Sequence, residues 1–156
     1  MKSILVYNAG PLFTEADGEQ RKKEQTYFDS LEGVSVFNPL TSTLNAEANS
    51  AVAIFEGDNQ PIQAANVIFF DLANNDPGTL VELGMVIQRI EDGADIDVYP
   101  VISDFRVKGR AEYTCDYAPV GYNSFVIGAL ESNKIKIYTS FAAAFEVFVT
   151  SLTESK

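Results

Sequence analysis

The sequence predicts an α/β protein with a doubly wound, flavodoxin-like or Rossmann-like sheet of five mostly parallel strands and helices on both faces. Three observations lead to this prediction. Short apolar runs of strand length alternate with longer segments of helical spacing. The run VIFFDL at residues 67–72 is apolar enough for a central strand buried on both faces. The length of 156 residues suits one core, so we expect a single domain over residues 1–156.

The first part of the chain predicts a strand, a helix and a second strand. Residues 3–9, SILVYNA, form an apolar run that is typical of a buried strand. Residues 15–31 predict a helix with aromatic and leucine side chains on its inner face. Residues 34–37 predict a short strand, which ends at Asn38 and Pro39 because proline interrupts a strand.

The middle of the chain predicts two helices around the central strand. Residues 46–65 are mostly helical in composition, and Pro61 should force a kink or a restart. The loop 73–78 follows the central strand. Four apolar residues beyond it fall on one helical stripe: Leu80, Leu83, Ile87 and Ile90.

The last part of the chain predicts the two remaining strands. Residues 97–102 and 134–138 are expected to be the fourth and fifth strands, with a short helix over residues 124–130 between them. Residues 103–120 read as an irregular loop that could cover a site. The final helix is indicated by aromatic and leucine residues at helical spacing: Phe141, Phe145, Phe148 and Leu152.

Composition and charge exclude several classes of function. The net charge of −11 disfavours nucleic acid as a partner, because an acidic protein repels phosphate backbones. We expect no membrane segment, since no apolar run approaches the length of a membrane span. The single cysteine, Cys115, cannot form an internal disulfide, and we expect a cytoplasmic protein.

The absence of histidine restricts the possible chemistry further. It excludes catalysis by an imidazole base and removes the commonest zinc ligand, so we expect no metal site. Neither a GxGxxG nor a GxxxxGK[ST] motif occurs, which weighs against a nucleotide cofactor, and we expect no cofactor. Carboxylates are therefore the main candidates for proton transfer and nucleophilic attack.

The stretch DPGTLVELG at residues 76–84 lies at the edge of the sheet where ligands bind. In doubly wound sheets, ligands bind beyond the carboxyl ends of the strands. Spacing alone favours a capping box, with Thr79 as N-cap and Glu82 at the third helical position. The same geometry would hold Glu82 ionised at the positive end of the helix dipole, as a nucleophile requires. The two interpretations are compatible.

The other candidate residues each have an ordinary structural explanation. Asp76 lies among turn-forming residues, and Asp58 could be a solvated charge on a helix surface. Tyr7 could be a core aromatic, Asn123 a turn or cap residue, and Asp71 a cap for the loop that follows its strand.

The sequence resembles the nucleoside 2-deoxyribosyltransferase family along nearly its whole length. DPGTLVELG carries the most specific likeness, because it resembles the family pattern Asp-x-Gly-(Thr/Ser)-(Ala)-x-Glu-(Leu/Val/Ile)-Gly. The other segments that resemble the family, in the same order, are VYNAGPLF, FNP, EGDNQPIQAANVIFFDL, YNSFVIGAL and KIYTSFAAAFEVF.

The resemblance implies a role for each candidate residue. It makes Glu82 the nucleophile, Tyr7 the residue that orients it, and Asp76 the carboxylate that moves the proton of the base. Asp58 would recognise the base, and Asn123 would reach the sugar site of a neighbouring subunit, so the resemblance implies a homo-oligomer that is at least a dimer. Further substrate-binding positions are implied at Gly10, Pro11, Phe13, Asn38 and Gly78.

The implied reaction is transfer of 2-deoxyribose between purine or pyrimidine bases, with a deoxynucleoside and a free nucleobase as substrates and a place in nucleoside salvage. One alternative is an N-glycosidase that hydrolyses deoxynucleosides or nucleoside 5′-monophosphates. The apolar residues after the first strand, such as Pro11 and Leu12, favour a neutral nucleoside over a phosphorylated one. An alternative of another class is a non-catalytic nucleoside-binding or sensor domain.

Overall fold

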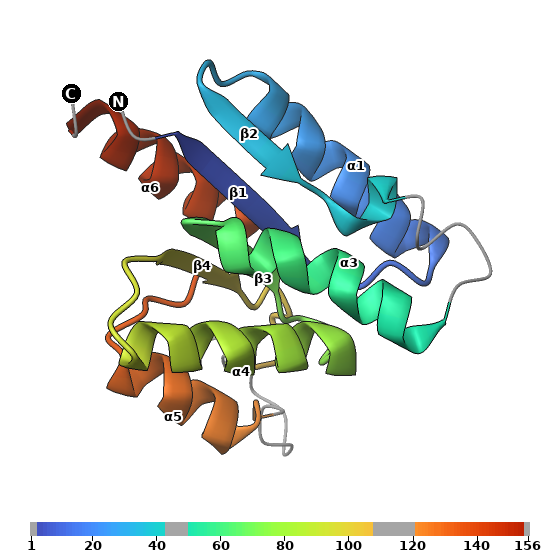
Figure 1. Cartoon of the computed structure of the whole chain (residues 1–156). Helices are drawn as coiled ribbons and strands as arrows, with labels where there is room; N and C mark the ends of the chain where they lie inside the picture. Colours follow the sequence, from blue (N-terminus) through green and yellow to red (C-terminus); the bar gives the residue numbers. More distant parts are fainter. Residues whose placement is uncertain (1–2, 43–49, 108–120, 155–156) are drawn as a thin grey trace.

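The computed structural model describes residues 3–42, 50–107 and 121–154. In this part of the chain, a parallel sheet of four strands has the order β2-β1-β3-β4 (Figure 1). Its strands are β1 (Ile4–Ala9), β2 (Val34–Phe37), β3 (Val67–Asp71) and β4 (Asp97–Val101). The crossover between β1 and β3 is the switch point at which a doubly wound sheet binds its ligands.

The predicted fifth strand at residues 134–138 is not confirmed. Only Tyr138 pairs with β4, through an isolated parallel bridge to Val101. Two features limit the pairing. Ile135 N still donates to Leu130 O at 2.9 Å, which ties the start of the segment to the preceding helix. Pro100 on β4 accepts a hydrogen bond from Tyr138 N at 2.8 Å but has no N–H to donate in return.

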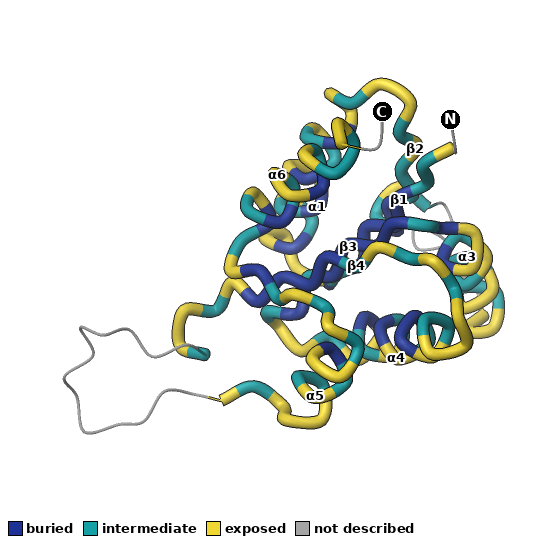
Figure 2. Tube along the Cα trace, turned by 90° about the vertical axis from the view of Figure 1, so that its left-hand side faces the viewer, coloured by how far each residue is buried: buried dark blue, intermediate teal, exposed yellow. Residues whose placement is uncertain are grey.

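Helices cover both faces of the sheet, as predicted. Figures 1 and 2 show α1 and α6 on one face and α3, α4 and α5 on the other. The helices are α1 (Glu15–Asp29), α3 (Ala51–Ala64), α4 (Pro77–Glu91), α5 (Ser124–Ser132) and α6 (Phe141–Glu154), with a short 3-10 helix η1 (Pro39–Thr41). None of the helices in the described ranges is long and apolar enough to cross a membrane.

Strand β3 is buried on both faces, as its apolar sequence predicts (Figure 2). Ile68 and Phe70 belong to the cluster under α3, α4 and α5, whereas Phe69 belongs to the cluster under α1 and α6. The second cluster is rich in aromatic rings, and Phe28 meets Phe69 edge to face at 5.1 Å between ring centroids.

Arg89 on α4 ties that helix to the end of α3. Its Nη1 donates to Ile62 O at 2.6 Å and its Nη2 donates to Gln63 O at 3.0 Å. These carbonyls lie in the last turn of α3, where backbone acceptors have no partner within the helix. The α3 helix is continuous through Pro61, so the predicted restart does not occur. Residues 43–49, where the helix was predicted to begin, lie outside the described residues.

Candidate active site

Tyr7 and Glu82 meet between the sheet and α4. The Tyr7 hydroxyl donates a hydrogen bond of 2.7 Å to Oε1 of Glu82. Tyr7 is completely buried, and Glu82 is half-buried. Oε2 of Glu82 accepts no hydrogen bond from the described residues.

The position of Tyr7 follows from the pairing of the strands. Tyr7 is opposite Phe37 on β2 and Ile68 on β3. The rings of Tyr7 and Phe37 stack, with centroids 5.4 Å apart and planes inclined by 13°. Phe37 was not among the residues predicted for the site. Tyr7 and Phe37 are both the fourth residue of their strands, but the contact depends on the register of the pairing, which the sequence alone does not give.

The N-cap of α4 is Asp76, so the predicted capping box of Thr79 and Glu82 is wrong. Asp76 Oδ2 accepts from Thr79 N at 2.8 Å and from Thr79 Oγ1 at 2.9 Å. Pro77 occupies the first helical position, where its fixed φ is favourable and its missing N–H costs nothing. Glu82 therefore lies in the second turn of α4, one turn further from the helix end than its predicted place.

The electrostatics of Glu82 differ from the sequence prediction for the same reason. The pKa of Glu82 is raised to about 7, mainly by burial; the hydrogen bond from Tyr7 opposes the shift, and the negative charges of Asp58 and Asp76 contribute to it. The predicted effect of the helix dipole fades beyond the first turn. Glu82 is therefore a carboxyl group that changes charge near neutral pH, rather than one held ionised at every pH.

Tyr7 and Asp58 complete this group of titratable side chains. Burial raises the pKa of Tyr7 far above its usual range, and the neighbouring charge of Glu82 adds to the effect, so Tyr7 remains a hydrogen-bond donor. Asp58 lies on α3 and is half-buried rather than a freely solvated surface charge. Burial also raises the pKa of Asp58.

Gly10 faces a buried arginine. A Cβ atom at Gly10 would lie 2.0 Å from Nη1 of Arg21, so only glycine fits there. Arg21 is 1% exposed, and it donates to Ala9 O at 3.1 Å and to Asp71 Oδ2 at 2.6 Å. Asp71 Oδ1 also accepts from Ala73 N, which confirms its predicted capping of the loop. Arg21 thus joins the carboxyl ends of β1 and β3 beneath the predicted crevice.

Asn38 and its neighbours in the predicted site differ greatly in exposure. Asn38 is 2% exposed; its Nδ2 donates to Arg21 O at 3.2 Å, and its Oδ1 accepts from Leu40 N at 3.1 Å. Pro11 is buried, whereas Phe13 is 84% exposed. Gly78 is exposed in the first turn of α4, and a Cβ there would lie 3.2 Å from Asp76 Oδ2.

Asn123 is the N-cap of α5. Its Oδ1 accepts from Phe125 N at 3.0 Å and from Val126 N at 3.3 Å, and its side chain is exposed. No hydrogen bond of the described residues links Asn123 to Tyr7 or Glu82. Residues 108–120, which hold Cys115 and most of the predicted loop, lie outside the described residues.

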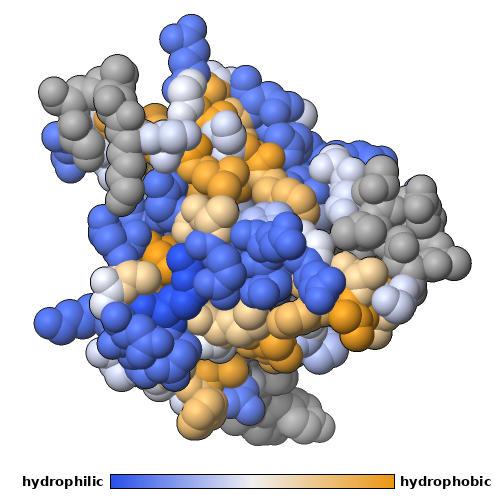
Figure 3. Space-filling model, viewed as in Figure 1, coloured by the Kyte–Doolittle hydropathy of each residue, from blue (hydrophilic) through white to orange (hydrophobic). Residues whose placement is uncertain are grey.

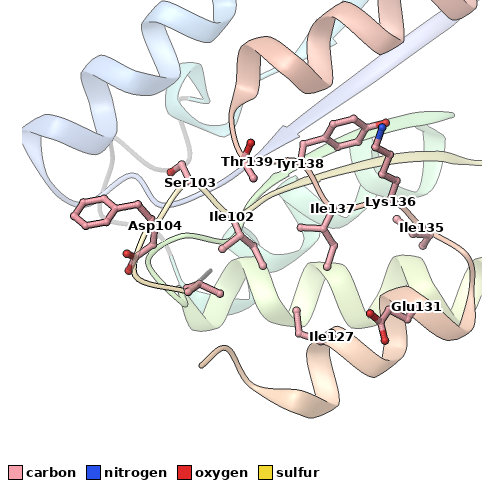
Figure 4. Close-up of a pocket in the computed structure, with 12 residues that line it drawn as sticks. Ile102, Ser103, Asp104, Ile127, Glu131, Ile135, Lys136, Ile137, Tyr138 and Thr139 are labelled. Carbon is pink, nitrogen blue, oxygen red and sulfur yellow. The ribbon is translucent and has the colours of Figure 1, made fainter. Parts of the chain in front are cut away.

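Two cavities lie away from the Tyr7–Glu82 pair. The larger, of about 730 Å³, lies between the segment after β4, α5 and residues 135–139 (Figure 4). Its walls are mostly apolar, with Ile102, Ile127 and Ile137 among them. The smaller, of about 370 Å³, lies on the α1 side near Asp17 and Asn74. The wall of the larger cavity includes two carboxylates, Asp104, which pairs with Arg106, and Glu131. We place the candidate site at Glu82 because a tyrosine hydroxyl donates directly to that carboxylate.

The arrangement around Glu82 suits nucleophilic chemistry at a carbon centre. Glu82 has one oxygen held by a permanent donor and one available, and two further carboxylates act on its charge. Among the described residues, no group of three or more acidic or cysteine side chains is arranged to hold a metal ion.

A family model describes most of this chain. Residues 6–114 match the model of the nucleoside 2-deoxyribosyltransferase family, and this range contains Tyr7, Asp58, Asp76 and Glu82. The chain belongs to this family. The family assignment agrees with the resemblance that DPGTLVELG carries.

This chain is similar to another protein in sequence and to two solved structures in fold. An uncharacterized protein of Ureaplasma parvum serovar 3 is 31% identical over 117 residues, which are 68% of this chain and 74% of that protein. A conserved protein of Enterococcus faecalis has a similar structure, with a TM-score of 0.75, 18% identity, and coverage of 92% of this chain and 95% of that one. A 2-desoxiribosyltransferase of Leishmania mexicana has a TM-score of 0.67 and 21% identity, with coverage of 94% and 97%. At these identities the two structures show a shared fold.

Proposed function

We propose that this protein transfers 2-deoxyribose between nucleobases, with Glu82 as the nucleophile. The observation that carries the proposal is the 2.7 Å hydrogen bond from Tyr7 to Oε1 of Glu82, within a chain that belongs to the 2-deoxyribosyltransferase family. A carboxylate oriented in this way suits retaining displacement at an anomeric carbon.

The first half of the proposed reaction forms a glycosyl ester. Oε2 of Glu82 forms a bond to C1′ as the bond from C1′ to the base nitrogen breaks. The electron pair of the broken bond goes to the base nitrogen, and a proton passed from solvent through Asp76 neutralises the leaving base. Tyr7 holds the carboxylate throughout, since its raised pKa keeps the hydroxyl protonated.

The second half reverses the first with a different base. A nitrogen of the incoming base attacks C1′, the ester bond to Glu82 breaks, and Asp76 accepts the proton of the base. Two inversions at C1′ retain its configuration. If water attacks in place of the base, the same intermediate gives free deoxyribose.

The charges around Glu82 support a neutral nucleoside as the substrate. The groups that influence the charge of Glu82 are Tyr7, Asp58 and Asp76, and none of them is a cation. A 5′-phosphate approaching this part of the protein would meet negative charge without compensation. We therefore propose deoxynucleosides rather than nucleotides, and a role in nucleoside salvage.

We also propose that the active form is an oligomer to which Asn123 contributes across an interface. Asn123 is exposed, and the adjacent Phe125 is 87% exposed, as suits residues covered by a partner. Other exposed apolar side chains lie on α3 and α4, at Val52, Phe55 and Val81. The face in Figure 3, on which these helices lie toward the viewer, mixes hydrophobic patches with hydrophilic ones.

Base exchange is the test of the proposed function. The protein is mixed with deoxyinosine and cytosine, or with thymidine and adenine, and the new deoxynucleoside is followed by chromatography. We expect an exchanged nucleoside with the wild-type protein and none with Glu82→Gln.

Three outcomes would contradict the proposal. Release of base and deoxyribose without exchange would identify a hydrolase. Binding of deoxynucleosides without any turnover would identify a sensor domain. A Glu82→Gln variant as active as wild type would exclude Glu82 as the nucleophile.

A further inference from the structure

Thr79 presents a buried hydroxyl at the start of α4. It is 3% exposed, although its neighbours Pro77 and Gly78 are exposed. A buried hydroxyl needs a hydrogen-bond partner, and that of Thr79 donates to Asp76 Oδ2 at 2.9 Å. The backbone N–H of Thr79 donates to the same oxygen at 2.8 Å and is sufficient for an ordinary helix cap. The hydroxyl is therefore an additional contact to Asp76.

Two donors on one oxygen fix the orientation of the Asp76 carboxyl group. With Oδ2 held toward Thr79, Oδ1 is on the opposite side of the carboxyl carbon, and it accepts no hydrogen bond from the described residues. Thr79 and Glu82 are three residues apart on α4 and therefore lie on the same face of the helix, so the carboxyl group held by Thr79 is on the side of the nucleophile. Oδ1 is thus the oxygen free to exchange a proton with a substrate beside Glu82.

We propose that Thr79 is a positioning residue that aims Oδ1 of Asp76 at the departing base. This inference rests on the proposed function and goes beyond it, because it assigns the proton transfer to one oxygen and the aiming to one hydroxyl. When the bond from C1′ to the base breaks, its electron pair goes to the base nitrogen. Oδ1 passes to the base a proton that it has taken from solvent, while the Thr79 hydroxyl continues to donate to Oδ2.

The inference predicts that Thr79 matters only when the leaving base needs a proton. Deoxyinosine needs one. In 7-methyl-2′-deoxyguanosine the base already carries a positive charge, so the electron pair of the broken bond neutralises it and no proton is transferred. Comparison of the two substrates therefore isolates the step that Asp76 performs from the step that Glu82 performs.

The variant Thr79→Val removes the hydroxyl and keeps both the side-chain volume and the backbone donor. We expect roughly a 10-fold lower kcat with deoxyinosine, less than the ~10²–10⁴-fold contribution of a positioned acid because Asp76 itself is retained, and less than about a twofold change with 7-methyl-2′-deoxyguanosine. Thr79→Ser keeps a hydroxyl and should restore the rate with deoxyinosine. Thr150→Val on α6, which removes a hydroxyl bonded to Glu146 O, is the matched control and should leave both rates unchanged.

The ratio of the two rates, measured on one sample, is independent of how much of the variant is folded. Equal losses with both substrates, no loss with either, or failure of Thr79→Ser to restore the rate would overturn the role of Thr79. The variant Glu82→Gln distinguishes a wrong role for Thr79 from a wrong proposed function. It should abolish turnover of both substrates, and full activity of that variant would overturn the proposed function itself.

Discussion

The hydroxyl of Tyr7 on β1 donates to Oε1 of Glu82 on α4, and so joins a core strand to the helix packed against it. The residues are 75 positions apart in the chain. The contact places an ionisable carboxyl group at the boundary between the core and the predicted crevice. Its burial and its charged neighbours make the state of Glu82 depend on pH near neutrality.

Activity should therefore rise with pH through about 7, the pKa of Glu82. Burial raises this pKa, so Glu82 is mostly protonated below pH 7, and a protonated carboxyl group is a poor nucleophile. We expect kcat/KM for deoxyinosine to fall about tenfold for each pH unit below the midpoint. A profile measured between pH 5 and pH 9 checks this, and a flat acid limb down to pH 5 would contradict it.

The variant Tyr7→Phe should shift the acid limb to higher pH. The hydroxyl of Tyr7 stabilises the ionised form of Glu82. Without it, burial and the neighbouring negative charges raise the pKa of Glu82 further. We expect a loss of roughly 10-fold in kcat/KM at pH 7, with partial recovery at pH 9. Tyr27→Phe, on the opposite face of the sheet, is the matched control and should keep the wild-type profile. An acid limb at the wild-type position in Tyr7→Phe would exclude this role.

The variant Asp58→Asn should shift the acid limb in the opposite direction. The negative charge of Asp58 raises the pKa of Glu82, so its neutralisation lowers that pKa and ionises the nucleophile at lower pH. We expect the acid limb of the pH profile to have a lower midpoint. An effect on recognition of the base would appear separately, as a change in KM. Asp29→Asn removes an exposed carboxylate on α1 and serves as the control. A midpoint that moves upward would refute the coupling of Asp58 to Glu82.

Glu82→Gln should stabilise the protein at alkaline pH while abolishing transfer. The pKa of Glu82 is raised in the folded state, so its contribution to stability is present below the unfolded value of 4.5 and is lost as pH rises through about 7. Glutamine has no charge to bury, so the free energy of unfolding at pH 8 should rise, by at most about 3 kcal/mol. Urea denaturation at pH 8 and pH 4 measures the difference, which should disappear at pH 4. The exposed Glu146→Gln on α6 should show no such pH-dependent gain.

Gly10→Ala should destabilise the fold, because the added Cβ would collide with the guanidinium of Arg21. Displacement of Arg21 would disturb its hydrogen bonds to Ala9 and Asp71, and we expect a loss of about 1–3 kcal/mol. Gly18→Ala on α1 is the control with open space around the added atom, and it should stabilise the helix by about 0.5–1 kcal/mol. Thermal unfolding of both variants provides the comparison, and equal melting temperatures would contradict the prediction.

The sequence was sufficient to predict the sheet with helices on both faces, but not the number of strands in the sheet. The apolar run in β3 and the helical stripe of α4 reflect burial, which depends on local composition, and both were predicted correctly. The fifth strand failed because its pairing depends on Pro100 in another strand and on the end of α5, which are long-range features. The family assignment followed from DPGTLVELG and its match.

The start of α4 shows where local patterns become ambiguous. Thr79 and Glu82 have the spacing of a capping box, but Asp76 three residues earlier accepts from Thr79 N and takes the cap. A capping box does occur at the start of α1, where Thr14 and Asp17 bond reciprocally. Capping depends on the path of the preceding loop, which the spacing of Thr79 and Glu82 does not reveal.

The bond from Arg89 to the last turn of α3 determines how accurately two carboxylates are held. Arg89 lies about 10 Å along α4 from Glu82, since seven residues separate them, and Asp58 lies one turn before Ile62 on α3. A change of roughly 5° in the angle between the helices at Arg89 would move Glu82 relative to Asp58 by about 1 Å. Displacements of about 1 Å can cost an enzyme a hundredfold in rate. If Glu82 and Asp58 have their proposed roles, the hydrogen bonds of Arg89 help to keep the two carboxylates in register from a distance.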